Sequence, residues 1–206
     1  MKKIFSLLSL TCLTVFNMSI FAQDATSTLD DYLDRNPIYD YQELQLNSTD
    51  TIPDFESKTT KIKVTGTIYQ SDGVTPAKDV ILFIEQADET GDFDLRTSND
   101  KRYVHHRAWV KTDADGQYTL YTFVPGNDRR YNQLQQLFPV IKEPKKPEYE
   151  LASFLFDDDP LLTKLCRKRM AKKGDPTRVL KLEKEGDLLV AHKNIVLNSD
   201  NTTALN

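Results

Sequence analysis

Histidine, tyrosine and arginine gather in one short segment, residues 103–109, which reads Tyr-Val-His-His-Arg-Ala-Trp. Imidazole, phenol and guanidinium groups can bind metal ions or aromatic ligands. If the segment is a regular strand, neighbouring side chains point to opposite faces, and His105 and His106 do not ligate one ion together. His105 then shares a face with Tyr103 and Arg107. We expect this row either to line a ligand pocket or to form cross-strand pairs on a solvated face.

Three consecutive aspartates at 157–159 form a second candidate site, because Ca²⁺ prefers oxygen ligands. Pro160 follows them, and lysines and arginines are frequent from there to residue 173. A capping acid, a proline in the first turn and bases in the last turn are all typical of a helix. The sequence therefore predicts a helix that begins at the aspartates, with calcium binding as the alternative.

The elements that must position these residues are short strands. Residues 62–68 alternate apolar and polar side chains, which indicates a half-buried strand, whereas the continuous apolar run 80–84 is typical of a strand covered on both faces. Further strands are predicted over 108–112 and 118–123, joined by an Asp-Gly turn. Short strands at this spacing, rich in β-branched and aromatic residues, predict a mainly β protein, a β-sandwich.

Three passages resemble the intradiol ring-cleavage dioxygenase family, especially its short secreted bacterial members. They read GTIYQSDGVTPAKDVILFIEQADETG (66–91), RAWVKTDADGQYTLYTFVPG (107–126) and IKEP with FDDDPLLT (within 141–163). The resemblance implies an intradiol-dioxygenase-like, transthyretin-like (prealbumin-like) β-sandwich with an N-terminal arm and one short C-terminal helix. It also implies cleavage of a catechol by O₂ at an Fe(III) held by two tyrosines and two histidines, ligands that suit this hard cation.

At the positions that match the family's four iron ligands, this chain has other residues. The first tyrosine position is Phe93, and the two histidine positions are Gln136 and Phe138. The second tyrosine position falls near Asp128, with Tyr131 a few residues further along.

No His-x-His motif occurs anywhere in the chain, so a shift of the alignment does not restore the ligands. We interpret the four positions as a former iron pocket that has been refilled or opened. The alternative is a different metal site that uses Asp128, Tyr131 and His105.

The chain is predicted to be exported. Two lysines and a long apolar run precede Ala22 and Gln23, as in a signal peptide cleaved at that point, and no later apolar run is long enough to span a bilayer. The expected organisation is a signal peptide (1–22), an acidic N-terminal arm that covers the sheet (23–60), the sandwich (61–198) and a flexible tail (199–206).

Charge and cysteine content restrict the partners. The acidic net charge of −4 argues against nucleic acid. Cleavage of the signal peptide removes Cys12 and leaves Cys166, so no intramolecular disulfide is expected. We expect Cys166 to pack as a small buried hydrophobe.

These observations predict a secreted, periplasmic or extracellular binding protein, a pseudoenzyme without a metal cofactor. Its expected partner is a small aromatic compound or a component of the envelope or cell surface. The candidate ligand-binding residues are Tyr103, His105, Arg107 and Tyr131. One alternative is an active intradiol, catechol-type dioxygenase with Fe(III) held by unrecognised ligands. The other is a structural transthyretin-like module of an envelope assembly.

Overall fold

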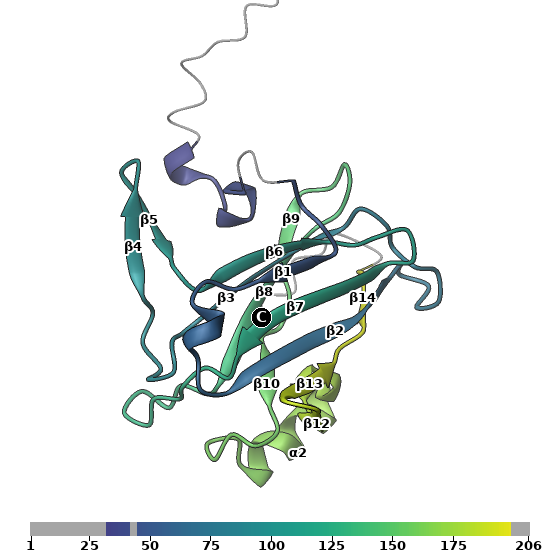
Figure 1. The fold of residues 1–206 in the computed structure, drawn as a ribbon. Coiled ribbons are helices and arrows are strands. Elements are labelled where there is room, and N and C mark those ends of the chain that lie inside the picture. Colours follow the sequence, from purple (N-terminus) through teal and green to yellow (C-terminus); the bar gives the residue numbers. More distant parts are fainter. Residues whose placement is uncertain (1–31, 42–44, 199–206) are drawn as a thin grey trace, which may run out of the picture. The chain divides into compact units, whose positions relative to one another are not determined.

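The computed structural model describes residues 32–41 and 45–198. The chain divides into two compact units, residues 1–34 and 35–206. Every strand of the described residues, shown as arrows in Figure 1, belongs to the second unit. The predicted signal peptide, the first part of the arm and the tail lie outside the described residues. None of the helices in the described part of the chain is long and apolar enough to cross a membrane.

The first sheet has six strands and contains the alternating segment predicted around residues 62–68. Buried Ile62, Val64 and Ile68 lie on one face of its central strand, which pairs antiparallel with the neighbour that carries Leu120. The strands run in the order β1 (Thr49–Thr51), β7 (Gln117–Phe123), β2 (Lys61–Tyr69), β13 (Leu188–His192) and β12 (Glu183–Glu185), with β14 (Ile195–Val196) also paired to β2.

The second sheet contains the predicted continuous apolar run, which is buried on both faces. Its strands run in the order β11 (Val179–Leu180), β10 (Phe154–Phe156), β8 (Gln136–Lys142), β3 (Ile81–Gln86) and β6 (Arg107–Lys111), with β9 (Glu148–Glu150) paired to β8. The remaining elements are the hairpin of β4 (Leu95–Ser98) and β5 (Lys101–Val104), the 3₁₀ helices η1 (Pro37–Tyr39), η2 (Phe55–Ser57) and η3 (Pro176–Arg178), and the helix α2 (Lys164–Lys173).

The main core lies between the two sheets. Val64 and Leu120 of the first sheet belong to the same buried cluster as Leu82 and Ile141 of the second. Removing these apolar faces from water is the main force that holds the sheets together. The predicted β-sandwich is therefore confirmed.

Within residues 35–41, the N-terminal segment packs on the outer face of the second sheet. Ile38 is fully buried and packs against Phe83, Trp109 and Val140. The indole Nε1 of Trp109 donates a hydrogen bond to the carbonyl of Ile38 at 3.0 Å.

The predicted start of the C-terminal helix was wrong. The helix begins at Lys164 and is capped by Thr163, whose Oγ1 accepts a hydrogen bond from the backbone N–H of Cys166. Asp159 is buried instead, and its carboxylate accepts hydrogen bonds from the backbone N–H groups of Gln135 and Leu161. Asp159 therefore stabilises the loops before the helix and does not cap the helix.

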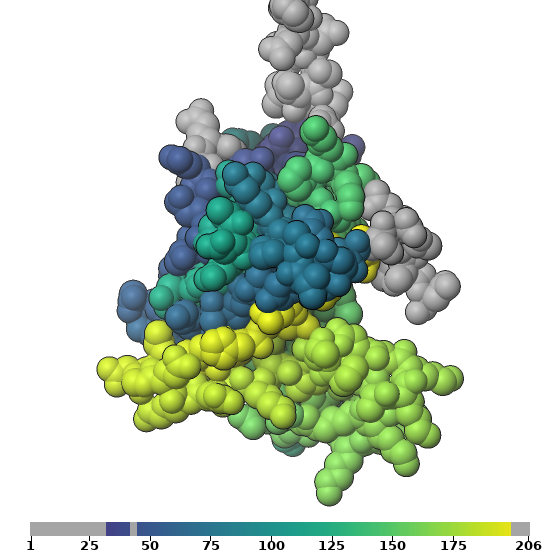
Figure 2. All heavy atoms as spheres, turned by 90° about the vertical axis from the view of Figure 1, so that its right-hand side faces the viewer, coloured from purple at the N-terminus to yellow at the C-terminus, as the bar shows by residue number. Residues whose placement is uncertain are grey.

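The predicted burial of Cys166 was also wrong, because the residue is only half-buried. None of the residues Lys164–Lys173, all of which are described, is buried. In Figure 2 this region, in yellow-green, lies on the surface below the C-terminal strands, in yellow. A helix without an apolar stripe has no buried face on which a cysteine can pack.

Candidate functional site

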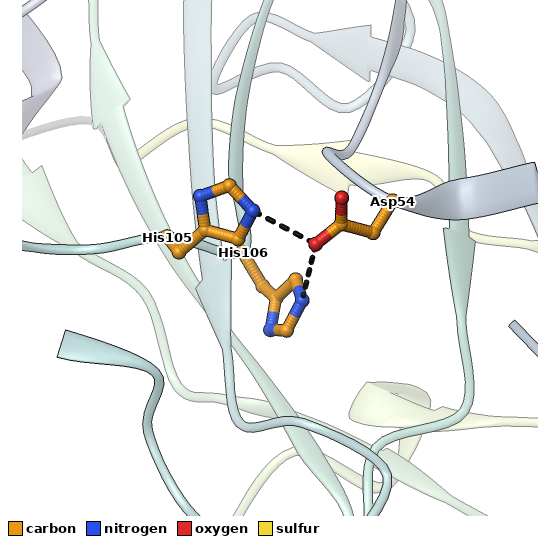
Figure 3. Close-up of side chains that lie close together, drawn as sticks. All are labelled: Asp54, His105 and His106. Atoms are coloured by element: carbon orange, nitrogen blue, oxygen red, sulfur yellow. Dashed lines mark hydrogen bonds and ion pairs between the residues drawn. The ribbon is translucent and has the colours of Figure 1, made fainter. Parts of the chain in front are cut away.

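Asp54, His105 and His106 lie close together, as Figure 3 shows. One carboxylate oxygen, Asp54 Oδ2, is 2.9 Å from His105 Nε2 and 3.7 Å from His106 Nε2. One potential ligand atom from each residue lies within 4.8 Å of the other two. Two imidazoles and a carboxylate thus converge on a small region.

A break between β5 and β6 allows both histidines to face the same carboxylate. His105 and His106 lie in a bend, where the backbone N–H of Arg107 bonds to the carbonyl of His105 at 2.9 Å. The backbone N–H of His105 bonds to the carbonyl of Asp94, and the carbonyl of His106 accepts from Gln86. The expectation that the two histidines do not ligate one ion held only for a regular strand, and the chain bends at His105 and His106, so the condition is not met.

Asp54 comes from the turn that precedes η2. Its φ of 64° lies in the left-handed region, which is uncommon for residues other than glycine. The hydrogen bond from His105 lowers the pKa of the Asp54 carboxyl, so the carboxylate form is favoured. The Asp54 side chain is 48% exposed and leaves the group open to solvent on one side.

His106 is the buried member of the group. The residue is 2% exposed, and its ring packs edge-on against Phe123 with centroids 5.0 Å apart. Burial lowers the pKa of His106, and the positive charge of Lys58 lowers it further, whereas Asp54 partly opposes the shift. The imidazole is therefore held neutral and retains a lone pair on one ring nitrogen.

The four positions that the sequence resemblance predicts as former iron-ligand positions are filled or paired. The rings of Phe93 and Phe138 are in contact, with centroids 5.7 Å apart. The side-chain oxygen of Gln136 accepts a hydrogen bond from the Ser153 hydroxyl at 2.9 Å. Phenyl rings have no lone pair to donate, so this set of residues does not fit Fe(III).

Asp128, the fourth of these positions, is held by Arg130. The guanidinium lies 2.7 Å from the carboxylate and lowers the pKa of Asp128. The Tyr131 side chain is largely exposed, with Arg130 above its ring. His105 is paired with Asp54 and Asp128 with Arg130, so two members of the alternative metal site have other partners. The alternative site of Asp128, Tyr131 and His105 stays a prediction.

Arg107, one of the candidate ligand-binding residues, lies on the outer face of the second sheet. The guanidinium of Arg107 lies 4.1 Å from the ring centroid of Tyr103. Glu85 is opposite Arg107 on one neighbouring strand and opposite Phe138 on the other. Burial raises the pKa of Glu85, and Arg107 partly offsets this shift. Arg107, Glu85 and Phe138 therefore form a row across three strands, which we call the outer row.

Sequence reasoning missed Asp54 and Glu85. Glu85 had a signal in the sequence, since it is the first charged residue after the apolar run 80–84. Asp54 had no local signal, because it is 51 residues away from His105 along the chain.

Comparison with known proteins identifies the class of fold. No protein-family model and no curated protein matches the chain. Among solved structures, it is similar to the dioxygenase domain of a dioxygenase carbohydrate-binding protein fusion from Streptomyces sp. SirexAA-E. The TM-score is 0.57 and the identity 20%, over 76% of this chain and 93% of that one.

Two further structures have the same fold. An intradiol ring-cleavage dioxygenase from Tetranychus urticae matches with a TM-score of 0.54 and 15% identity, over 78% of this chain and 91% of that one. Hydroxyquinol 1,2-dioxygenase from Pseudomonas putida DLL-E4 matches with a TM-score of 0.55 and 15% identity, over 77% of this chain. This chain spans only 63% of that enzyme. The predicted intradiol-dioxygenase-like fold is confirmed, and at such identities the similarity concerns the fold alone.

Proposed function

We propose that this chain is an exported binding protein that has the intradiol-dioxygenase fold without the ferric site. The observation that carries the proposal is the contact between Phe93 and Phe138, at two of the four positions where the family resemblance places iron ligands. The pairing of Asp128 with Arg130 supports it, because a carboxylate already held by a guanidinium is a poor candidate for metal binding.

The proposed ligand is a small aromatic compound with hydroxyl or carboxylate substituents, bound at the outer row. Half-buried Phe138 offers a ring for stacking, and Arg107 can donate to an anionic oxygen. Glu85 can accept from a phenolic hydroxyl. Since hydroxyquinol and catechol dioxygenases share this fold, catechol-type compounds are the natural first probes.

The intrinsic fluorescence of one residue can test this proposal. The chain has a single tryptophan, Trp109, whose ring lies 5.0 Å from the Arg107 guanidinium. Titration with catechol or protocatechuate should change its emission saturably. Arg107→Lys should weaken binding, because an ammonium lacks the planar donor fork. Arg96→Lys alters an exposed arginine and should bind like the parent. Emission that never changes, or responds equally in Arg107→Lys, contradicts a ligand at the outer row.

A second experiment tests the loss of the ferric site. Restoring the family's ligands should place two phenolates and two imidazoles around one point, so the variant should take up ferric iron that the parent does not bind. Iron bound equally by parent and variant would contradict the proposed loss. The variant combines Phe93→Tyr, Asp128→Tyr, Gln136→His and Phe138→His.

A further inference from the structure

We propose that Asp54, His105 and His106 form a binding site for a divalent transition-metal cation of the Zn²⁺ class. None of these residues matches an iron-ligand position of the family, and the inference does not depend on the proposed function. Figure 3 shows both imidazoles directed at the same carboxylate oxygen.

The spacing of the three groups fits a small tetrahedral ion. Zinc lies about 2.0–2.1 Å from histidine nitrogen and carboxylate oxygen, so neighbouring ligand atoms in a tetrahedral site are about 3.3 Å apart. The two distances from Asp54 Oδ2, 2.9 Å to His105 and 3.7 Å to His106, lie on either side of this value. The ligand atoms of the two histidines also lie within 4.8 Å of each other.

The buried imidazole of His106 is an independent indication of a ligand. Neither of its ring nitrogens has a hydrogen-bond partner among the described residues, although the side chain is only 3% exposed. A buried polar group without a partner is unfavourable and rare in folded proteins. A cation bound at Nε2 would provide the missing partner.

The donor set indicates the class of ion. Two imidazoles with one carboxylate suit zinc and ferrous iron, whereas calcium and magnesium prefer oxygen ligands alone. The exposed side of Asp54 leaves room for water as a further ligand. Three protein ligands with one open position is the arrangement of catalytic zinc sites.

Lys58 works against cation binding and provides a test. Its ammonium lies 4.6 Å from the ring centroid of Phe123, the ring against which His106 packs. Its positive charge acts on both Asp54 and His106. Removal of this charge by Lys58→Gln should therefore raise the affinity for a divalent cation.

Calorimetric titration of the mature protein with Zn²⁺, after treatment with a chelator and its removal, tests the site. Asp54→Asn should weaken binding by at least about 10-fold, the loss expected even when a residue that only orients a ligand is removed. Asparagine tolerates the left-handed backbone of residue 54, so the variant should fold. His105→Asn should weaken binding in the same way. Cobalt(II) absorption bands should appear in the parent and be lost in both variants.

Two matched variants separate this site from unspecific surface binding. His192→Asn removes an exposed histidine, and Asp94→Asn removes a carboxylate near the two histidines but outside the group. His192→Asn should bind Zn²⁺ like the parent, and Lys58→Gln should bind it more tightly. Asp94→Asn should weaken binding less than Asp54→Asn, because its charge acts on His106 but the residue is not a ligand. The proposal is overturned if the parent binds no Zn²⁺ at millimolar concentration, or if Asp54→Asn and His105→Asn retain the parent's affinity.

Discussion

Asp40 holds the arm against the second sheet through buried charges, and removing its charge should destabilise the protein strongly. Its side chain is 3% exposed and lies 3.0 Å from the ammonium of Lys101, which is itself 7% exposed. The guanidinium groups of Arg35 and Arg107 lie 3.2 and 3.6 Å from the same carboxylate. Asp40→Asn should cost about 3–5 kcal/mol, because it removes a buried negative charge that faces the buried ammonium of Lys101.

Urea unfolding followed by far-UV circular dichroism and by Trp109 fluorescence measures this cost. Because Trp109 donates to the carbonyl of Ile38 in the arm, its emission also detects release of the arm alone. Asp94→Asn is the control: it breaks a surface pair with Arg96 and should leave the urea midpoint close to that of the parent.

A double variant tests the physical reason. Asp40→Leu with Lys101→Met removes the most buried pair of this cluster and should recover part of the loss, since apolar replacement of a buried pair is often neutral. If both probes give Asp40→Asn a free energy of unfolding within about 1 kcal/mol of the parent's, the buried charges do not hold the arm and the reasoning is refuted.

Three further outcomes concern pH, the thiol and export. With a chelator present, the free energy of unfolding should fall as the pH is lowered from about 7 to about 5. In the unfolded chain His106 takes up a proton with a pKa near 6.5, whereas burial lowers the pKa of His106 in the folded protein. In His106→Phe, the urea midpoint should lose this pH dependence. Cys166 should react with a thiol reagent in the folded protein, and labelling only after unfolding would contradict its partial exposure. The exported protein should begin at Gln23, and an acylated Cys12 would refute this.

The strands could be predicted from the sequence because local patterns encode them. The alternation in 62–68 marks a strand with one face in the core, and the continuous run 80–84 marks one buried on both faces. The resemblance also assigned Phe93 and Phe138 to one pocket, and their rings are in contact. That this pocket once held iron remains a prediction.

The Asp54 group could not be predicted, because it depends on two features without a local pattern. One is the bend at His105 and His106, which cannot be recognised when the segment is interpreted as a regular strand with alternating faces. The other is the approach of the turn that carries Asp54, 51 residues before His105. Similarly, the sequence pattern predicted that the aspartates at 157–159 cap a helix. In the structure the carboxylate of Asp159 instead accepts hydrogen bonds from backbone N–H groups of two loops.

Metal analysis of the purified mature protein together with its visible spectrum tests the central claim most directly. Tyrosinate bound to Fe(III) absorbs strongly in the visible, whereas zinc bound by imidazole and carboxylate is colourless. The residues at Phe93, Asp128, Gln136 and Phe138 predict a protein without a tyrosinate–iron band, even where a divalent metal is present. A coloured protein with about one iron per chain, whose band persists in Asp54→Asn, would contradict the loss of the ferric site.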